Sequence, residues 1–136
     1  MSLYSTVEYI KNKAKAQPNV GLVYEGDIYD LNERQDISYP AVVASQSTHV
    51  ESGDFRAYGF NLFYVDRLTA DKSNRLEIQS IAIEALSNIA KALEDEGYEI
   101  SELRYHCFDE RFDAECAGAY VEITLSEPDY LCEEKY

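Results

Sequence analysis

The sequence predicts an α+β fold, in which a mostly antiparallel sheet of about four to five strands is packed by one long helix and a short N-terminal helix. Phe55 to Leu68 is a long stretch with apolar residues on both faces, as in a strand inside a sheet. Residues 74 to 96 place apolar side chains over a helical arc of about 200°, wider than the ~100° stripe that one-sided packing needs. With 136 residues, residues 1–136 are expected to form a single α+β domain.

The N-terminal segment predicts the short helix. Ser5 and Glu8 have the spacing of a capping box, and Pro18 would end the helix. One helical face is apolar and consists of Leu3, Val7, Ile10 and Ala14. The lysines beyond that face are read as solvated. A strand is expected next, from Val20 to Tyr24.

A hairpin should follow. Its first strand contains Tyr39 to Ala44 and begins at or just after Pro40, where a proline need not donate to a sheet. The turn composition of Glu51 to Asp54 joins it to the apolar strand from Phe55. Along that strand the side chains expected on one face are Tyr58, Phe60, Leu62 and Tyr64, and those expected on the other are Phe63 and Val65.

The long helix has both end signals. Asn74 and Glu77 form a capping box with Asn in place of Ser or Thr, and Gly97 supplies a C-terminal stop. Two further strands are predicted, from Leu103 to Phe108 and from Ala119 to Leu125, the second with one wet face. Between them Asp109 to Ala117 is a charged connection, and residues 129–136 read as a flexible acidic tail.

The charge is strongly acidic. Twenty-six acidic residues against twelve basic ones give a net charge of −14, which repels phosphate and disfavours specific nucleic-acid binding. A basic protein partner, or DNA that must pass without attachment, remains compatible with this charge. From Lys91 onward there are fourteen acidic and four basic residues, whereas residues 1 to 19 hold one acid and three lysines. The two ends are therefore expected to attract each other, within a chain or between subunits.

The cysteines and apolar runs bear on the setting of the protein. The chain has three cysteines, Cys107, Cys116 and Cys132. An odd number without the spacing of a metal or redox site favours reduced thiols in the cytoplasm. No apolar run approaches the ~18 residues of a membrane span. We therefore expect no membrane segment and no export signal.

Candidate catalytic and metal-binding groups are weak. His106 and Cys107 suggest an activated thiolate, but neighbours on a strand point to opposite faces. No paired spacing supports a metal site that would use His49, His106, Cys107 or Cys116. The run Asp109 to Glu115 lacks the ligand spacing of an EF-hand, and whether it binds a cation stays open. We predict no enzyme activity and no cofactor.

The order of segments resembles the small tail-terminator or tail-completion (head-tail joining) proteins of tailed bacteriophages and prophages. The residues that carry the resemblance are Ser38 to Val43, Tyr58 to Arg67, Asn74 to Gln79 and Arg111 to Leu125. The resemblance implies a helix-on-sheet subunit, without enzyme activity or cofactor, that assembles into a ring, often a hexamer. Such a ring ends the tail tube and meets the head connector, so tail-tube and head-connector proteins are the implied partners.

Two function classes follow. The first is a structural ring protein of a phage or prophage, in the cytoplasm during assembly and in the tail or neck of the virion afterwards. The second is an acidic intracellular binding module, like an immunity or inhibitor protein, that masks a basic partner. A small enzyme that uses the acidic loop is a weaker third. For the ring, the predicted subunit-interface residues are Ile81, Ile83, Phe63 and Tyr120, since excess apolar helix surface and tyrosines suit subunit contacts.

Overall fold

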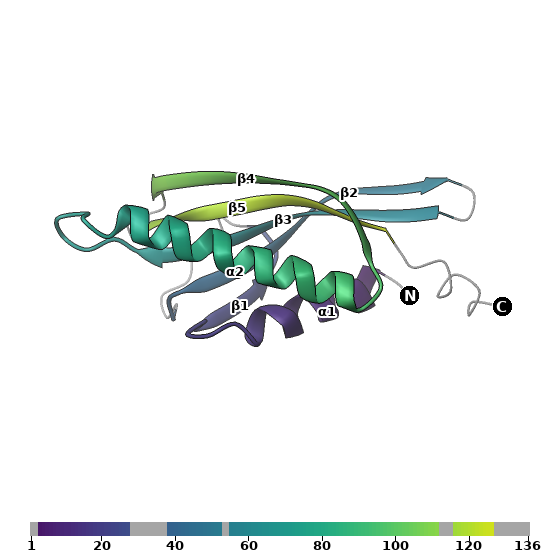
Figure 1. Cartoon of the computed structure of the whole chain (residues 1–136), viewed down its shortest axis with the longest axis horizontal. Coiled ribbons are helices and arrows are strands. Elements are labelled where there is room, and N and C mark those ends of the chain that lie inside the picture. The colour runs from purple at the N-terminus through teal and green to yellow at the C-terminus, as the bar shows by residue number, and fades with distance from the viewer. Residues whose placement is uncertain (1–2, 28–37, 53–54, 112–115, 127–136) are drawn as a thin grey trace.

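A computed structural model describes residues 3–27, 38–52, 55–111 and 116–126. Within these residues the chain forms two helices and one five-stranded sheet, which confirms the predicted α+β fold (Figure 1). The elements in chain order are α1 (Leu3–Lys15), β1 (Leu22–Glu25), β2 (Ala41–Ser52), β3 (Phe55–Arg67), α2 (Arg75–Asp95), β4 (Glu99–Arg111) and β5 (Cys116–Ser126).

The sheet is antiparallel except at one edge. Its strand order is β1-β2-β3-β5-β4, with β1 parallel to β2 and every other neighbouring pair antiparallel. β2 and β3 form the predicted hairpin, and β2 begins directly after Pro40 as expected. β3 lies between β2 and β5 and is therefore interior to the sheet. Because β3 is interior, its side chains on both faces pack among those of the neighbouring strands, which explains why both faces are apolar.

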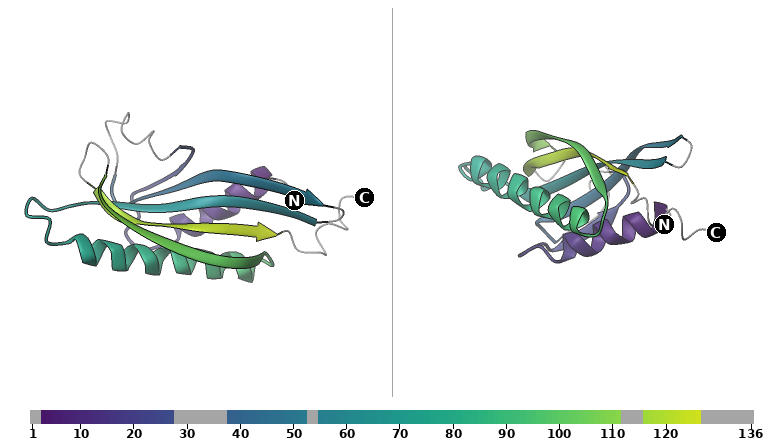
Figure 2. Two further views of the ribbon diagram at one scale, coloured as in Figure 1. Left: turned by 90° about the horizontal axis from the view of Figure 1, so that it is seen from above. Right: turned by 45° about the vertical axis from the view of Figure 1, so that its right-hand side comes forward.

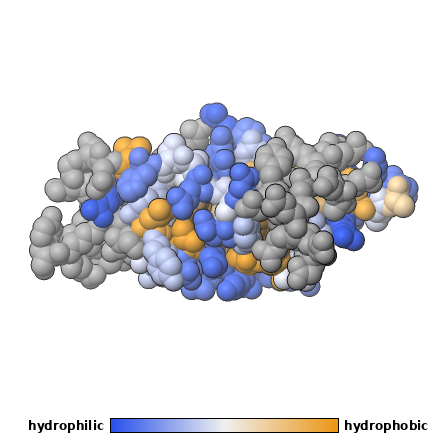
Figure 3. Space-filling view, turned by 180° about the vertical axis from the view of Figure 1, so that it is seen from behind, coloured by the Kyte–Doolittle hydropathy of each residue, from blue (hydrophilic) through white to orange (hydrophobic). Residues whose placement is uncertain are grey.

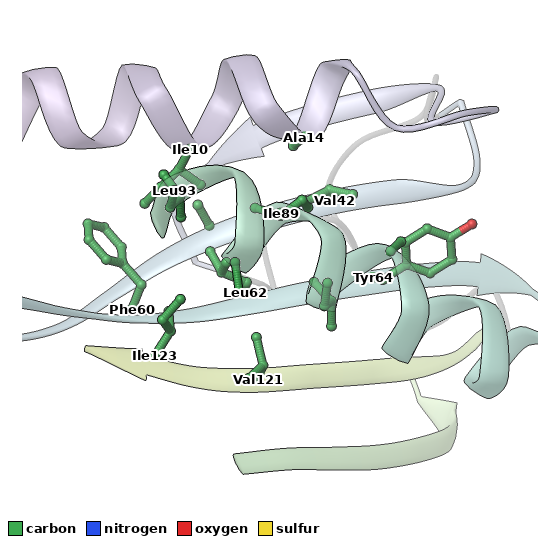
Figure 4. Close-up of a cluster of buried hydrophobic side chains, with 14 of the residues drawn as sticks. Ile10, Ala14, Val42, Phe60, Leu62, Tyr64, Ile89, Leu93, Val121 and Ile123 are labelled. Carbon is green, nitrogen blue, oxygen red and sulfur yellow. The ribbon is translucent and has the colours of Figure 1, made fainter. Parts of the chain in front are cut away.

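Both helices lie on the same face of the sheet (Figure 2). The main core forms between them and the sheet, and its strand residues include Phe60, Leu62 and Tyr64 of β3 (Figure 4). From β5 the same core takes Val121 and Ile123. Phe63 and Val65 belong instead to a smaller cluster on the opposite face, so the predicted alternation along β3 is confirmed.

α2 begins and ends where the sequence predicts, but its first turn is not capped as expected. Gly97 follows it with φ of 103°, the left-handed conformation that glycine adopts without strain. Asn74 makes no side-chain cap hydrogen bond, so the predicted capping box is wrong. Instead, Asn74 Oδ1 accepts from the Thr69 backbone N–H at 2.9 Å, and its Nδ2 donates to the Arg67 carbonyl at 3.2 Å. The side chain closes the turn between β3 and α2.

α1 is anchored to the far end of α2. Its predicted face is confirmed, since Val7, Ile10 and Ala14 are buried. The helix begins at Leu3, which places Ser5 inside its first turn and makes the predicted capping box there wrong. Lys13 Nζ lies 2.7 Å from Glu96 Oε1, so the attraction expected between basic and acidic ends is realised once within the chain.

Tyr98, the residue that leads from α2 into β4, ties the same corner together. Its hydroxyl lies 3.0 Å from Thr6 Oγ1, and both residues are buried. Its ring meets that of Tyr9 edge-on, with centroids 6.1 Å apart. A buried hydroxyl needs such a partner, because an unpaired one would lose its hydration without replacement.

Several predicted boundaries shift. β1 covers Leu22–Glu25, two residues later at its start than expected. β4 runs from Glu99 to Arg111, so the charged connection is shorter than Asp109 to Ala117. Residues 112–115 of that connection and the predicted flexible tail, residues 129–136, lie outside the described residues. Neither described helix is long and apolar enough to cross a membrane.

Candidate interaction surfaces

The face of the sheet opposite the helices, here called the open face, carries rows of side chains that run across the strands. One row consists of Val43, Phe63, Tyr120 and His106, which are consecutive partners on β2, β3, β5 and β4. The next row consists of Ser45, Asn61, Glu122 and Arg104. In the view from behind, apolar side chains gather near the middle of the molecule between hydrophilic ones (Figure 3).

Three rings of the first row are in contact. The ring centroids of Phe63 and Tyr120 lie 4.9 Å apart, and those of Tyr120 and His106 lie 4.7 Å apart with an interplanar angle of 17°. Phe63 is 7% exposed, whereas Tyr120 and His106 are half-buried. We call these three residues the aromatic row. Such a row stabilises the sheet and also offers flat, partly wet rings of the kind that protein interfaces use.

The second row is polar. His106 Nε2 lies 3.2 Å from Glu122 Oε2, which links the two rows across β4 and β5. Beside them is a hollow of about 400 Å³. Its lining is Ser47, Thr48, Phe60, Asn61, Arg104, Glu122, Ile123 and Thr124. Hydroxyls, an amide and one pair of opposite charges suit a polar protein surface better than a small apolar ligand.

On the other side of the molecule, α2 leaves two large apolar side chains in solvent. Leu76 is 72% exposed and Ile81 is 46% exposed. Ile83 is partly buried and packs against the main core. The buried residues of α2 are Ile78, Gln79, Ala82, Ala85, Leu86, Ile89, Ala90 and Leu93. The predicted surplus of apolar surface is therefore real but small, and it lies at the N-terminal half of the helix.

The four predicted interface residues do not share one surface. Ile81 is exposed on α2 and Ile83 is largely used by the core, whereas Phe63 and Tyr120 lie on the open face. The sequence reasoning also missed the exposed Leu76 and the stacking of His106 on Tyr120. No local pattern signals that stacking, because it depends on the register between β4 and β5.

A partly buried cluster of Tyr39, Arg67 and Cys116 at one end of the open face holds two groups whose pKa is raised. Burial, and then a hydrogen bond with Cys116, raise the pKa of Tyr39 to about 12. Burial likewise raises the pKa of the Cys116 thiol. The Arg67 guanidinium lies 5.1 Å from the centre of the Tyr39 ring. A buried thiol that keeps its proton is a poor nucleophile, so this cluster has a packing role.

The other candidate nucleophile is not assembled either. His106 stacks on the open face, whereas Cys107 pairs with Ala119, whose side chain belongs to the helix-covered face. Within the described ranges no three His, Cys, Asp or Glu side chains are grouped to hold a metal ion. The stretch from Asp109 to Glu115, considered above for cation binding, falls partly outside those ranges.

Comparison with known proteins adds no identity. No protein-family model matches the sequence, and no curated protein matches it.

Proposed function

We propose that this chain is a non-enzymatic structural subunit that assembles into a ring at the end of the tail tube or at the head-tail junction of a phage or prophage. The observation that carries the proposal is the one-sided cover of the sheet. Both helices pack on one face, and the opposite face presents the aromatic row. A subunit of a cyclic ring needs two different contact surfaces, one for each neighbour. The open face and the exposed side of α2 are two such surfaces.

The chemistry of both surfaces supports this role. Interfaces are enriched in tyrosine and other aromatic residues, and Tyr120 has its ring half-buried in the aromatic row. On α2, Leu76 and Ile81 would gain from leaving water, at roughly 25 cal/mol for each Å² of apolar surface buried. A subunit that meets two neighbours can cover both surfaces at once.

The net charge of −14 fits a ring through which DNA passes. Like charge removes attractive sites for the phosphate backbone, so DNA would move past without being held. The same charge makes subunits repel one another at low salt, and salt screens that repulsion over a Debye length of about 10 Å at 0.1 M. Ring formation should therefore increase with ionic strength, the opposite of the trend for a complex with a basic partner.

Native mass spectrometry and light scattering on the purified protein test the proposal. We expect a closed oligomer of ring size, alone or with tail-tube protein, whose fraction rises with salt. Tyr120→Ala should reduce it, whereas Tyr4→Ala, on α1 and 74% exposed, should not. A strict monomer that binds a basic toxin with nanomolar affinity, more weakly as salt rises, would overturn the proposal in favour of the immunity or inhibitor class.

A further inference from the structure

The sheet has two free edges within the described part of the chain. β1 pairs with β2 only from Ala41 to Ala44, and the Gly26 backbone N–H then donates to the Ala44 carbonyl at 3.0 Å. From Gln46 to Ser52 the outer side of β2 has no strand partner among the described residues. At the opposite end of the sheet β4 pairs with β5 alone. Each edge presents a row of backbone donors and acceptors that can take another strand.

The free edge of β2 lacks the charges and prolines that often prevent strand addition, and a β-bulge is the one protective feature that it carries. Natural edge strands carry charges, prolines or an inward charge to block pairing. From Ile37 to Val50 the sequence contains no Asp, Glu, Lys or Arg, although 28% of the chain is charged. Gln46 to Val50 are all exposed, and Val50 is 51% exposed. An acidic protein thus leaves an uncharged β-strand edge in water.

The end of β1 coincides with an irregularity that shapes this edge. Between Gln46 and Thr48 the register with β3 shifts by one residue, which leaves Ser47 as the extra residue of a bulge. Gly59 faces the bulge, where a Cβ would overlap the side-chain oxygens of Thr48 and Ser47. Such a bulge increases the local twist, so the strand beyond it is turned relative to β1.

The edge of β4 has a matching regular stretch. Its pairing with β5 is irregular between Ile100 and Leu103 and again between Phe108 and Arg111, and it is continuous from Leu103 to Phe108. No Asp or Glu occurs in this six-residue stretch, which contains Arg104 and His106. Two acid-free stretches of similar length, Gln46 to Val50 and Leu103 to Phe108, therefore lie at opposite ends of one sheet.

We propose that the β2 edge from Gln46 to Val50 of one subunit pairs with the β4 edge from Leu103 to Phe108 of the next copy of this chain. β2 and β4 run in opposite directions in the sheet, so a neighbour placed in the same orientation makes this pair antiparallel. Contact at acid-free strands also avoids the repulsion between two copies of charge −14. The inference rests on the ring-forming function proposed above and adds a strand contact, between two different edges of the sheet, to the surfaces named there.

Cysteine cross-linking tests the pairing directly. Cys107 is an exposed native thiol on β4, and it points to the helix-covered side of the sheet. Gln46 and His49 pair with Phe60 and Tyr58 of the core, so they point to the same side at the β2 edge. Cross-strand Cβ atoms lie about 5 Å apart. Gln46→Cys and His49→Cys, each in a Cys132→Ser background, are therefore treated with a short bifunctional maleimide.

We expect a ladder of covalent species larger than dimers, which disappears when Cys107→Ser is added. Thr48→Cys is the matched control, because it points to the open face from the same edge and should cross-link less. Dimers that persist after Cys107→Ser would overturn the inference in favour of a two-fold β2–β2 contact. No cross-link in a preparation that native mass spectrometry shows to be a ring would overturn it while leaving the ring intact. A protein that stays monomeric throughout would overturn the ring and this contact together.

A second variant blocks the edge without touching the core. Val50→Lys puts a charge on the free edge, and Tyr4→Lys makes the same kind of change on α1 as a control. Lysine on an edge strand opposes strand addition, so Val50→Lys should raise the concentration needed for assembly about tenfold or more. Equal assembly of the two variants would contradict the role of the β2 edge.

Discussion

Substitutions of Ile81 distinguish an effect on the stability of the fold from an effect on assembly. The side chain is 46% exposed, so about half of its surface is already in water. Complete burial of an isoleucine contributes about 1.5–3 kcal/mol, and half of that is at stake here. In Ile81→Glu, Glu77 and Glu84 stand one helical turn away and add a repulsion of a few tenths of a kcal/mol each. We expect the free energy of unfolding to fall by about 1–2 kcal/mol.

Ile81→Lys distinguishes charge from apolar contact. The lysine stands one turn from Glu77 and Glu84, which makes the local electrostatics favourable. Its unfolding free energy should therefore lie above that of Ile81→Glu. Leu86→Ala marks the other extreme, since Leu86 is 0% exposed and such a change costs about 2–5 kcal/mol in a core. Urea denaturation followed by circular dichroism gives all three values.

Both Ile81 variants should assemble more weakly than the native chain. A charged group brought into an interface without a partner loses hydration, at about 1–3 kcal/mol or more per contact, and each 1.4 kcal/mol is a factor of ten in affinity. Native mass spectrometry over a concentration series measures the effect. If both variants form the native oligomer at native concentrations, Ile81 lies outside the interface. If Ile81→Glu unfolds as readily as Leu86→Ala, the assigned exposure of this side chain is wrong.

Three further changes test the sheet and the partly buried cluster. Gly118→Ala should lower the unfolding free energy by about 1–3 kcal/mol or more, because its Cβ would overlap the Tyr64 backbone carbonyl oxygen. An unchanged urea midpoint would contradict the close approach of Gly118 to Tyr64. The pKa of Tyr39 is about 12 in the folded chain and 10.0 in the unfolded chain, so between these pH values unfolding releases a proton and the native chain loses stability. Tyr39→Phe should therefore lose less stability than the native chain as pH rises from 10 to 12. Parallel profiles of unfolding free energy against pH would contradict this. Burial raises the pKa of Asp66 above 3.8, so its carboxylate opposes folding at neutral pH. Asp66→Asn should be more stable at pH 7 and lose that advantage below pH 3.8, and an equal gain at both pH values would point to a cause other than ionisation.

Patterns that repeat along the chain predicted the elements well. Alternation identified both faces of β3 and its interior position, since its side chains enter the main core on one face of the sheet and the smaller cluster on the other. Helical spacing likewise identified the buried face of α1. These signals are strong because burial acts on many side chains at once.

Single polar residues were predicted less well. The Asn74 side chain had two competing sets of partners, the first turn of α2 and the turn that follows β3. In the fold it accepts from Thr69 and donates to Arg67, a choice that depends on where β3 ends. Ser5 has the same ambiguity, since a helix that starts at Leu3 leaves it no capping role. Local spacing cannot distinguish such alternatives.

The apolar arc of α2 is predicted to be wider than one face of a sheet can cover. In the fold the sheet and α1 cover most of it, and only Leu76 and Ile81 stay exposed as large apolar side chains. α1 reaches the C-terminal half of α2, as the Lys13 and Glu96 bridge indicates. The N-terminal half therefore keeps the surplus. A periodic pattern reports how much apolar surface a helix has, but the packing of a second helix decides how much of it remains available.

The free edges of the sheet follow from the strand order, which the sequence did not reveal. Beyond Ala44 the strand predicted from Tyr39 continues into polar residues, and Gln46 to His49 are exposed in the fold. β1 pairs with β2 only as far as Ala44, so these polar residues form an uncharged strand edge. The Ser47 bulge and Gly59 lie where that edge begins. On a chain of net charge −14, an edge free of charge is a place where two copies can approach with little repulsion, and this makes the β2 edge a surface to test for assembly.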